Sequence, residues 1–447
     1  MASNSRASIV IDVKNSMSAK LHNDAPLSAT SCIFRVPELL RKHNPDAYQP
    51  HIVSIGPLHL GTQQLQPIQD LKQWYLQNLL SNMKINSLDT LIEEILIVEE
   101  RAREFYEESL DSLSKNDFVE MLILDGCFLI QLFRKFHYNR HTPNNPVFNM
   151  DYMIEYLYHD LLLLENQLPW FVLDRLYTLT LDFYPSDYLS LRILILTVLS
   201  SEPSLKYSCK SYLEYVGDKR EDENEKVVHI LDLIRTSFVF PLKDVTPPAT
   251  GKISSLWKYK KPREKYAWKI PPATKLAKSG VEFKRGPVDS KSILNIKFKK
   301  GVFTIPQLLV TEMTEPLLRN LIAFEQCYRG RSYEITSYAV LLGRLIGSSS
   351  DMELLCEDKI IDNWLSADDG SKQVFNKLYN DTWLRGFLYH GLCAEVNTYY
   401  EVKWNHWEAK LKRDYCANPW MILSLIAAGL LLCLTAVQTV YTLLQYY

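Results

Sequence analysis

The residues from Pro419 to Leu444 include no charged side chain in 26 consecutive positions. At a rise of about 1.5 Å per residue, roughly 20 helical residues cross a hydrocarbon core about 30 Å thick. The alternative is a buried core helix, but helices of that kind are usually shorter and carry a polar face. Polar side chains are sparse here, as Ser424 and Gln438 illustrate. We therefore expect a single transmembrane helix over residues 419–444.

The residues around this segment predict its orientation. Trp420 and Tyr441 lie near its two ends, where amphipathic aromatic rings favour the membrane interfaces. Basic residues precede it (Lys403, Lys410, Lys412 and Arg413), and a positive flank usually stays in the cytosol. The N-terminal residues contain no apolar signal sequence, so we expect the apolar tail to be retained as an anchor. The predicted location is the plasma membrane or an endomembrane, with a cytosolic body. The small residues Ser424, Ala428 and Gly429 also predict a homodimer through the span.

About 400 residues precede the anchor, and the chain is 47% hydrophobic and 23% charged. That composition predicts one large or two medium domains with a real core. The eight cysteines are scattered without a CxxC pair or a Cys/His ligand spacing, which predicts reduced thiols, no structural metal and no cofactor. Cys416 lies four residues before Trp420 and could carry an acyl chain, with a plain thiol as the alternative.

Charge is unevenly distributed although the net charge is only -2. The segment from Lys252 to Lys300 contains 15 Lys and Arg residues and three acids, so its net charge is +12. The remaining chain therefore has a net charge of -14. Aromatic residues interleave with the basic ones in its first part. The interpretation without a binding function is that this basic segment is an exposed connector, which docks on the acidic body. The functional interpretation is contact with anionic lipid through Lys258, Lys260, Lys261, Arg263 and Lys265; nucleic acid is the least favoured partner.

The pattern along the chain predicts its organisation. We expect a disordered tail over residues 1–30, an N-terminal helical part over 31–216, a charged connector over 217–270 and a C-terminal part over 271–414. The fold class is mainly α with a small antiparallel β element (α+β). Alternating apolar residues predict a β-hairpin near 292–305 and a third strand over Val281–Lys284. Apolar spacing of three and four predicts several helices, among them Leu88–Leu113, Phe118–Phe136, Asp151–Leu168, Ser350–Asn363 and Leu388–Lys412.

Three polar clusters interrupt apolar helices, where an ionised group costs several kcal/mol unless it is paired. They contain Asp125; then His159, Asp160, Glu165, Asn166 and Gln167; and then Glu312, Glu315, Arg319 and Glu325. Asp125, Asp160 and Glu165 are the weak catalytic candidates, as ligands of a divalent metal or as acid and base. However, Asp160 and Glu165 are five residues apart, which is not a same-face spacing, and no Glu-x-x-His motif occurs. The structural interpretation is that the acids cap helices, bond loop backbone and pair with Arg319 or Arg175.

Other catalytic signatures are missing from the sequence. It contains no GxxxxGK[ST], GxGxxG, GxSxG or HExxH motif. Cys127 follows Gly126 and could suit a nucleophile, but its apolar neighbours predict a buried, inert thiol. His51 and His59 are eight residues apart and could meet in space, with satisfied loop histidines as the alternative. We assign no catalytic residue and no metal site.

Six segments carry a family resemblance. They are CIFRVPELLRKHNPDAYQPHIVSIGPLHLG, MLILDGCFLIQLF, DLLLLENQLPWFVLDRLY, IPPATKLAKSGVEFK, IPQLLVTEMTEPLLRNLIAFEQC and the hydrophobic C-terminal tail. In this order they resemble the plant family known as domain of unknown function 247, over roughly residues 32–440. The resemblance implies a plant protein, often membrane-associated through that tail, with no agreed enzymatic activity. Some grass members are associated with pollen-side self-incompatibility, which implies recognition of a partner.

Two functional hypotheses follow. The first is a tail-anchored recognition or signalling protein that binds an unidentified protein partner, which the anchor, the large body and the missing catalytic motifs favour. The second is a hydrolase or nuclease in which Asp125, Asp160 and Glu165 converge around a metal. Convergence of these three carboxylates distinguishes the two, because a catalytic site needs them to share one pocket.

Overall fold

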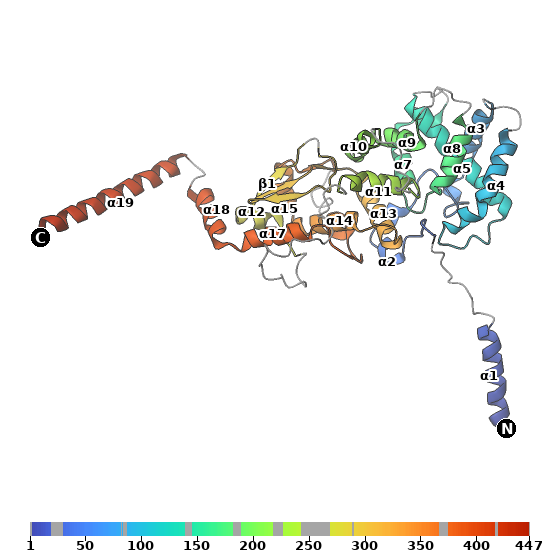
Figure 1. Cartoon of the computed structure of the whole chain (residues 1–447), viewed down its shortest axis with the longest axis horizontal. Helices are drawn as coiled ribbons and strands as arrows, with labels where there is room; N and C mark the ends of the chain where they lie inside the picture. The colour runs from blue at the N-terminus through green and yellow to red at the C-terminus, as the bar shows by residue number, and fades with distance from the viewer. Residues whose placement is uncertain are drawn as a thin grey trace, which may run out of the picture.

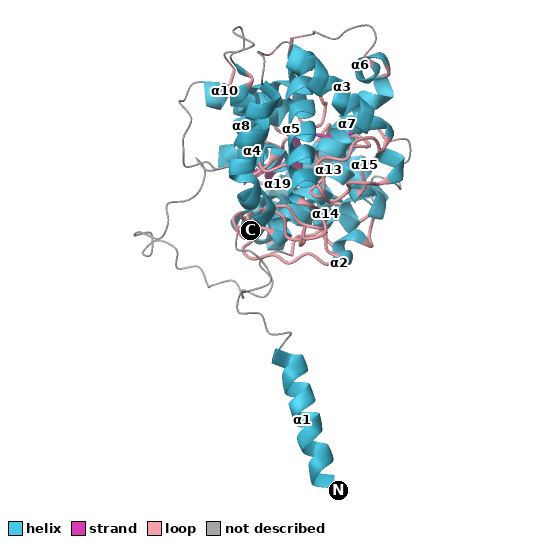
Figure 2. Cartoon of the chain, turned by 90° about the vertical axis from the view of Figure 1, so that its right-hand side faces the viewer, coloured by secondary structure: helices cyan, strands magenta, loops and turns pink. Residues whose placement is uncertain are grey.

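A computed structural model of the chain describes residues 2–18, 30–81, 83, 87–138, 145–181, 189–217, 227–242, 269–287, 290–365, 374–415 and 419–446. Helices make up most of this structure (Figure 2). The α-helices are α1 (Ala2–Ser18), α2 (Glu38–Arg41), α3 (Pro67–Ser81), α4 (Ser87–Glu104), α5 (Lys115–His137), α6 (Pro146–Asn149), α7 (Asp151–Leu161), α8 (Trp170–Leu179), α9 (Leu191–Leu199), α10 (Lys206–Gly217), α11 (Ile230–Val239), α12 (Ala273–Lys278), α13 (Thr314–Cys327), α14 (Glu334–Leu345), α15 (Ser349–Glu357), α17 (His390–Glu401), α18 (Lys403–Tyr415) and α19 (Pro419–Tyr446).

Short 3-10 helices and strands complete the element list. The 3-10 helices are η1 (Pro45–Tyr48), η2 (Gln63–Leu65) and η4 (Phe240–Leu242). The strands are β1 (Glu282–Arg285), β2 (Lys297–Lys299), β3 (Val302–Ile305), β4 (Leu308–Val310) and β5 (Ile361–Asn363). The prediction of a mainly helical body with a small β element and one apolar C-terminal helix is confirmed.

Helix α5 is the centre of the N-terminal part, where α3, α4, α8 and α9 pack around it (Figure 1). Ser114 caps the N-terminus of the helix by accepting a hydrogen bond from the Asp117 N–H. Basic residues occupy the last turn, where their positive charge interacts favourably with the helix dipole. Gly126 permits close contact with α8, since a Cβ at this position would lie 2.3 Å from Leu176 Cδ1. Most of α5 is buried, which explains its continuous apolar sequence.

Two small sheets lie in the C-terminal part. In the first, β3 lies between β1, which is parallel to it, and β2, which is antiparallel. Lys300 and Gly301 both have positive φ, as a two-residue hairpin turn requires. The hairpin and the third strand therefore form as the alternation predicts. The second sheet pairs β4 with β5 in parallel, aligning Leu308 with Ile361.

Several predicted helices end earlier than their apolar spacing suggested. The helix predicted over Leu88–Leu113 ends at Glu104, and the one over Asp151–Leu168 ends at Leu161. Residues 361–363 were predicted to be helical but form β5, because pairing with β4 satisfies their backbone there. The last predicted helix of the body divides into α17 and α18 around Val402.

The predicted disordered tail also differs from the structure. Residues Ala2–Ser18 form helix α1, while residues 19–29 lie outside the described ranges. No Gly or Pro interrupts residues 2–18, so the local sequence permits a helix. Residues 10–18 are exposed, which means that packing does not contribute to this helix.

One hydrophobic core runs through the body, from Cys32 in the first segment to Val396 in α17. It includes residues from both sides of the predicted connector, and the division into parts at residues 217–270 stays a prediction. Figure 1 shows α3, α4 and α5 at one end of the body and α17 and α18 toward the other. Helix α19 extends from that second end, away from the core.

Candidate functional site

The carboxylate of Asp160, at the end of α7, holds a buried backbone segment. Its Oδ2 accepts hydrogen bonds from the N–H groups of Ile52 at 2.7 Å and Val53 at 2.8 Å. Its Oδ1 accepts from the N–H of His51 at 2.8 Å and lies 3.0 Å from His159 Nδ1. Asp160 is fully buried, so these groups replace the water that an ionised carboxylate would otherwise need.

The same backbone segment continues to Gly56 and is held at each step by another polar side chain. Asn166 accepts from the Ile55 N–H at 2.6 Å and donates to the Val53 carbonyl at 3.0 Å. Asp125 in α5 accepts from the Gly56 N–H at 2.8 Å. Gly56 has a φ of +77°, and a Cβ there would lie 2.6 Å from the Gln167 carbonyl oxygen, so this position requires glycine.

Lys72 in α3 is the cationic partner of Asp125. Its ammonium contacts both Asp125 Oδ1 and the Ser54 carbonyl, and the side chain is 1% exposed. Burial raises the pKa of Asp125, although Lys72 and the Gly56 N–H act in the opposite direction. Each group thus replaces water for the other, and the desolvation cost of the pair is offset by two backbone contacts, to the Ser54 carbonyl and the Gly56 N–H.

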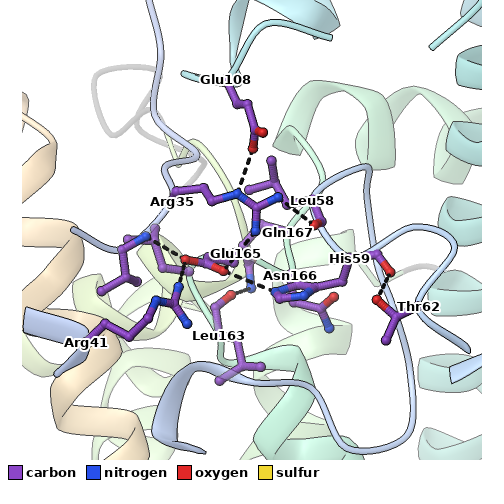
Figure 3. A network of polar contacts seen from close by, with 12 residues as sticks. Arg35, Arg41, Leu58, His59, Thr62, Glu108, Leu163, Glu165, Asn166 and Gln167 are labelled. Atoms are coloured by element: carbon purple, nitrogen blue, oxygen red, sulfur yellow. Dashed lines mark hydrogen bonds and ion pairs between the residues drawn. The ribbon is translucent and has the colours of Figure 1, made fainter. Parts of the chain in front are cut away.

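Glu165 lies in a different set of contacts, which Figure 3 shows from close by. Its Oε1 accepts from the Val36 N–H at 2.6 Å and pairs with Arg41. Its Oε2 lies 3.2 Å from His59 Nε2 and 3.6 Å from Arg35 Nη1. Burial acts to raise the pKa of Glu165, but these hydrogen bonds and the Arg41 charge outweigh it, so the pKa is lowered.

Two amide side chains join the N-terminal part of the body to the helices α11 and α13. Asn320 in α13 accepts from the Leu164 N–H at 2.9 Å and donates to the Ala47 carbonyl at 2.8 Å. Gln167 accepts from the Leu231 N–H at 3.1 Å. These contacts connect residues 44–48 and 161–167 to α13 and α11. The junction is held by neutral amides, which satisfy both donors and acceptors without a buried charge.

Glu325, near the end of α13, holds the beginning of α14. It accepts from the backbone N–H of Ile335 at 3.1 Å and of Thr336 at 2.9 Å, and pairs with Arg235 at 2.9 Å. Burial raises the pKa of Glu325, against the effect of Arg235 and the Thr336 hydrogen bonds. A carboxylate at a helix N-terminus satisfies N–H groups that have no partner within the helix.

A cleft of about 650 Å³ opens on the surface beside this network. Its acidic residues come from η1, α7, the first turn of α13 and the turns that follow α9 and precede α13: Asp46, Glu155, Glu315, Glu202 and Glu312. The lining also includes the exposed aromatic residues Tyr152, Tyr156 and Trp364. His51 and His159 contribute imidazole rings, whose centroids are 4.5 Å apart. The described lining includes no Lys or Arg.

The three catalytic candidates are engaged in separate contacts. Asp125 binds Lys72 and Gly56, Asp160 binds the backbone of residues 51–53, and Glu165 binds Val36 and Arg41. None of the three is among the residues described as lining the cleft. Within the described ranges, no three His, Cys, Asp or Glu side chains are grouped so as to hold a metal ion.

The two arginines expected as partners of these acids differ in outcome, since Arg319 does pair with one of the acids, Glu315, whereas Arg175 pairs with an acid outside the three clusters. Arg175 pairs with Glu94, and Arg319 pairs with Glu315 in its own helix at 2.6 Å. Lys72, Arg35 and Arg41 take their place beside the buried acids. Lys72 occupies the same helical face as buried Ile68, Tyr75 and Leu79, and this lysine within an apolar stripe was a signal that the sequence offered.

Other residues singled out from the sequence have structural surroundings. His51 packs against His159, whereas His59 contacts Glu165, so the structure does not bring these two loop histidines into one site. Burial raises the pKa of the Cys127 thiol to about 12, which makes it inert. Glu312 is exposed rather than embedded in a helix. Lys258, Lys260, Lys261, Arg263, Lys265 and Cys416 lie outside the described residues.

Helix α19 is the candidate membrane segment. Residues Ile426–Gln445 are long and apolar enough to cross a membrane, and none of this window is buried against the body. Exposed leucines such as Leu432, which is 72% exposed, lie along it without a covering element. A surface of this kind is unfavourable in water and suits a lipid environment.

Comparison with known proteins agrees with these observations. The family model described as a plant protein of unknown function, domain of unknown function 247, matches residues 33–434. The UPF0481 protein At3g47200 of Arabidopsis thaliana is 30% identical over 433 residues, covering 93% of this chain and 87% of that protein. The putative UPF0481 protein At3g02645 of the same plant is 24% identical, covering 96% of this chain and 93% of that protein. No solved structure matches the chain. The chain belongs to the domain of unknown function 247 family of plant proteins.

Proposed function

We propose that this protein is a membrane-anchored recognition protein, whose body binds a basic segment of a protein partner in the cleft beside α7 and α13. The cleft lining carries this proposal. Asp46, Glu155 and Glu312 are exposed acids in it, and no Lys or Arg is present among its described lining residues. Such a surface attracts a cationic segment and speeds its association.

The exposed aromatic rings support a peptide rather than a free metal ion as the occupant. Tyr152 is 56% exposed and Trp364 is 64% exposed, and flat aromatic faces bind Arg and Lys side chains through cation–π contact. Tyrosine and tryptophan are also the residues that most often dominate protein interfaces. The rigid network around Asp160 lies directly behind His51 and His159 of the lining, and holds the cleft in one shape.

Membrane anchoring is the second part of the proposal. Helix α19 would span the bilayer, and the basic residues before it would keep the body in the cytosol. A signalling role follows from the combination of an anchor and a recognition surface, because the anchor confines the complex to two dimensions and raises its effective concentration.

The test is a binding measurement with the full chain in detergent micelles and an array of lysine- and arginine-rich peptides. Glu155→Lys with Glu312→Lys should weaken the tightest peptide by tenfold or more, because two exposed acids of the cleft become basic. Glu353→Lys with Glu357→Lys is the matched control, since these exposed acids lie on α15 outside the cleft lining. Equal affinity of the two variants, or no binding of any basic peptide by the wild type, would contradict the proposal.

A second candidate function rests on one arrangement in the same cleft. His159 Nδ1 lies 3.0 Å from Asp160 Oδ1 and its ring lines the cleft beside His51. A carboxylate that orients an imidazole is the pairing used by general bases in hydrolysis. We propose this as the alternative, and a panel of ester and phosphodiester substrates tests it. Turnover by the wild type that is lost in His159→Gln would support hydrolysis; no turnover by the wild type would remove it.

A further inference from the structure

Helix α18 joins the body to α19 and has two different faces. Its inner face packs on the body through Asn405, His406 and Ala409, which are half-buried. Asn405 donates to the Tyr399 carbonyl at 2.9 Å. Gly280 lies against this face, because a Cβ there would be 3.3 Å from Ala409 Cβ. The helix is therefore held on the body in a fixed orientation.

The opposite face of α18 presents large apolar side chains to the surroundings. Trp404 is 68% exposed, Trp407 is 64% exposed and Leu411 is 49% exposed. Their spacing of three and then four residues places them on one side of a helix. The two indole rings lie next to each other, with centroids 6.4 Å apart. Exposure of two adjacent tryptophans is costly in water and suggests a surface that is covered in the working protein.

The charges around this apolar stripe are mostly positive. Lys403 and Lys410 are exposed beside it. With Lys412 and Arg413, the sequence from 403 to 413 carries four basic residues against Glu408, a net charge of +3. A helix with tryptophans on one face and lysines at its sides has the composition of helices that lie in the membrane interface.

The position of α18 in the chain selects the membrane as its occupant. Residues 416–418 alone separate Tyr415 from Pro419, and three extended residues reach at most about 10 Å. If α19 spans the bilayer, the C-terminal end of α18 at Tyr415 therefore lies within the depth of the lipid headgroups. A second copy of the chain has no comparable constraint that would bring it to this face.

We propose that α18 is an interfacial helix, with Trp404, Trp407 and Leu411 inserted among the lipid headgroups and its lysines paired with anionic lipid. The indole ring suits this depth because its body is apolar and its N–H can reach water or a headgroup. Since α18 also packs on α12 and α17, this contact fixes the orientation of the whole body against the membrane. The inference rests on the anchoring part of the proposed function and does not involve the cleft.

Fluorescence quenching by brominated lipid tests the proposal with the full chain in vesicles. The bromine is carried near the headgroup end of the acyl chain, so it quenches tryptophans at interface depth. The chain has nine tryptophans, and the proposal places Trp404, Trp407 and Trp420 within reach. Trp404→Phe with Trp407→Phe should lower the quenched share of emission, from about three of nine emitters to one of seven.

The matched control is Trp74→Phe with Trp383→Phe, which removes two exposed tryptophans of the body. It should raise the quenched share, to about three of seven emitters, so the two variants move the signal in opposite directions. A rise in both variants would overturn the proposal, and would also be the result if the α18 face bound a second copy. Replacing phosphatidylserine by phosphatidylcholine should reduce quenching in the wild type; no change would overturn the role of the lysines.

Anchoring is checked separately, which keeps the outcomes distinguishable. Extraction of the same vesicles at alkaline pH leaves a spanning protein in the membrane and releases a surface-bound one. If the protein is released, the anchoring part of the proposed function fails. If the protein is retained and Trp404→Phe with Trp407→Phe raises the quenched share, the interfacial role of α18 alone fails.

Discussion

Asp160 and Ile52 are 108 residues apart in the chain, yet the carboxylate accepts the Ile52 N–H at 2.7 Å. This contact belongs to a series in which side chains replace the backbone partners of residues 51–56. A segment without helix or strand rarely enters a protein core, because its N–H and C=O groups lose water there. Asp160, Asn166 and Asp125 satisfy these groups and so permit an irregular segment to pass between helices.

The first prediction concerns Asp160→Asn. The new amide group would face a backbone N–H, so at least one donor in the buried segment loses its acceptor. We expect the free energy of unfolding to fall by about 3 kcal/mol, as is usual for a buried charged acceptor. Chemical denaturation of the purified protein measures this. The matched control is Asp362→Asn, at an exposed position of β5, which should change stability by less than about 0.5 kcal/mol; equal effects would contradict the role of Asp160.

The second prediction concerns the junction between the two parts of the body. Asn320→Leu keeps the side-chain size but leaves the Leu164 N–H and the Ala47 carbonyl without their partner. We expect a loss of about 2 to 4 kcal/mol in unfolding free energy, because two buried backbone groups become unsatisfied. Protease resistance under native conditions should fall with it. Asn78→Leu is the control, since that amide donates to the Trp74 carbonyl of its own helix; an equal loss there would argue against a special role of Asn320.

Part of this arrangement could be predicted from the sequence. Periodicity identifies the buried helix α5, and the alternation of Ile296 and Phe298 with lysines identifies the hairpin, because these signals depend on neighbouring residues. Buried polar residues such as Asp125 and Glu165 could be recognised as needing partners. Their partners, for example Lys72 and Val36, could not be identified, because they are distant in the chain. The cleft was not predicted for the same reason: its lining comes from several separate segments.

The third prediction is a loss of stability in mild acid through His229. Burial lowers the pKa of His229 to about 4, with Arg331 acting in the same direction and Asp232 in the opposite one. The neutral ring accepts the Asp232 N–H at 3.1 Å. The unfolded chain binds a proton near pH 6.5 and the folded chain does not, so stability is complete above that pH and falls between pH 6.5 and 4. The expected loss is roughly 3 kcal/mol.

Thermal unfolding of His229→Asn as a function of pH measures this contribution. Asparagine can still accept the Asp232 N–H, but it does not titrate. We expect a smaller decrease of Tm between pH 6.5 and 4 than in the wild type. His390→Asn is the control, because His390 is exposed. If both variants keep the pH dependence of the wild type, another group causes the acid sensitivity.

The fourth prediction tests the orientation of the body. Asn380, Asp381 and Thr382 form a glycosylation sequon in a turn. A body in the cytosol does not meet the glycosylation machinery, so a glycosidase should not change the mobility of the protein. A variant with an added N-terminal signal sequence is the control, and it should be glycosylated at this site. Sugar on Asn380 in the unmodified chain would place the body on the other side of the membrane.

The fifth prediction concerns self-association through α19. Ser424 and Ala428 are four residues apart, and Gly429 has no other group within 4 Å of the position of a Cβ. Small residues on one helical face permit two helices to approach closely in lipid, where packing drives association. Ser424→Leu with Ala428→Leu should lower the dimer fraction, measured by energy transfer between labelled chains in vesicles. Leu430→Phe adds bulk on a side of the helix about 100° or more away from Ser424, Ala428 and Gly429. It should leave the dimer unchanged, since that side does not enter the contact. If the double variant associates as the wild type does, the small-residue face has no role in assembly.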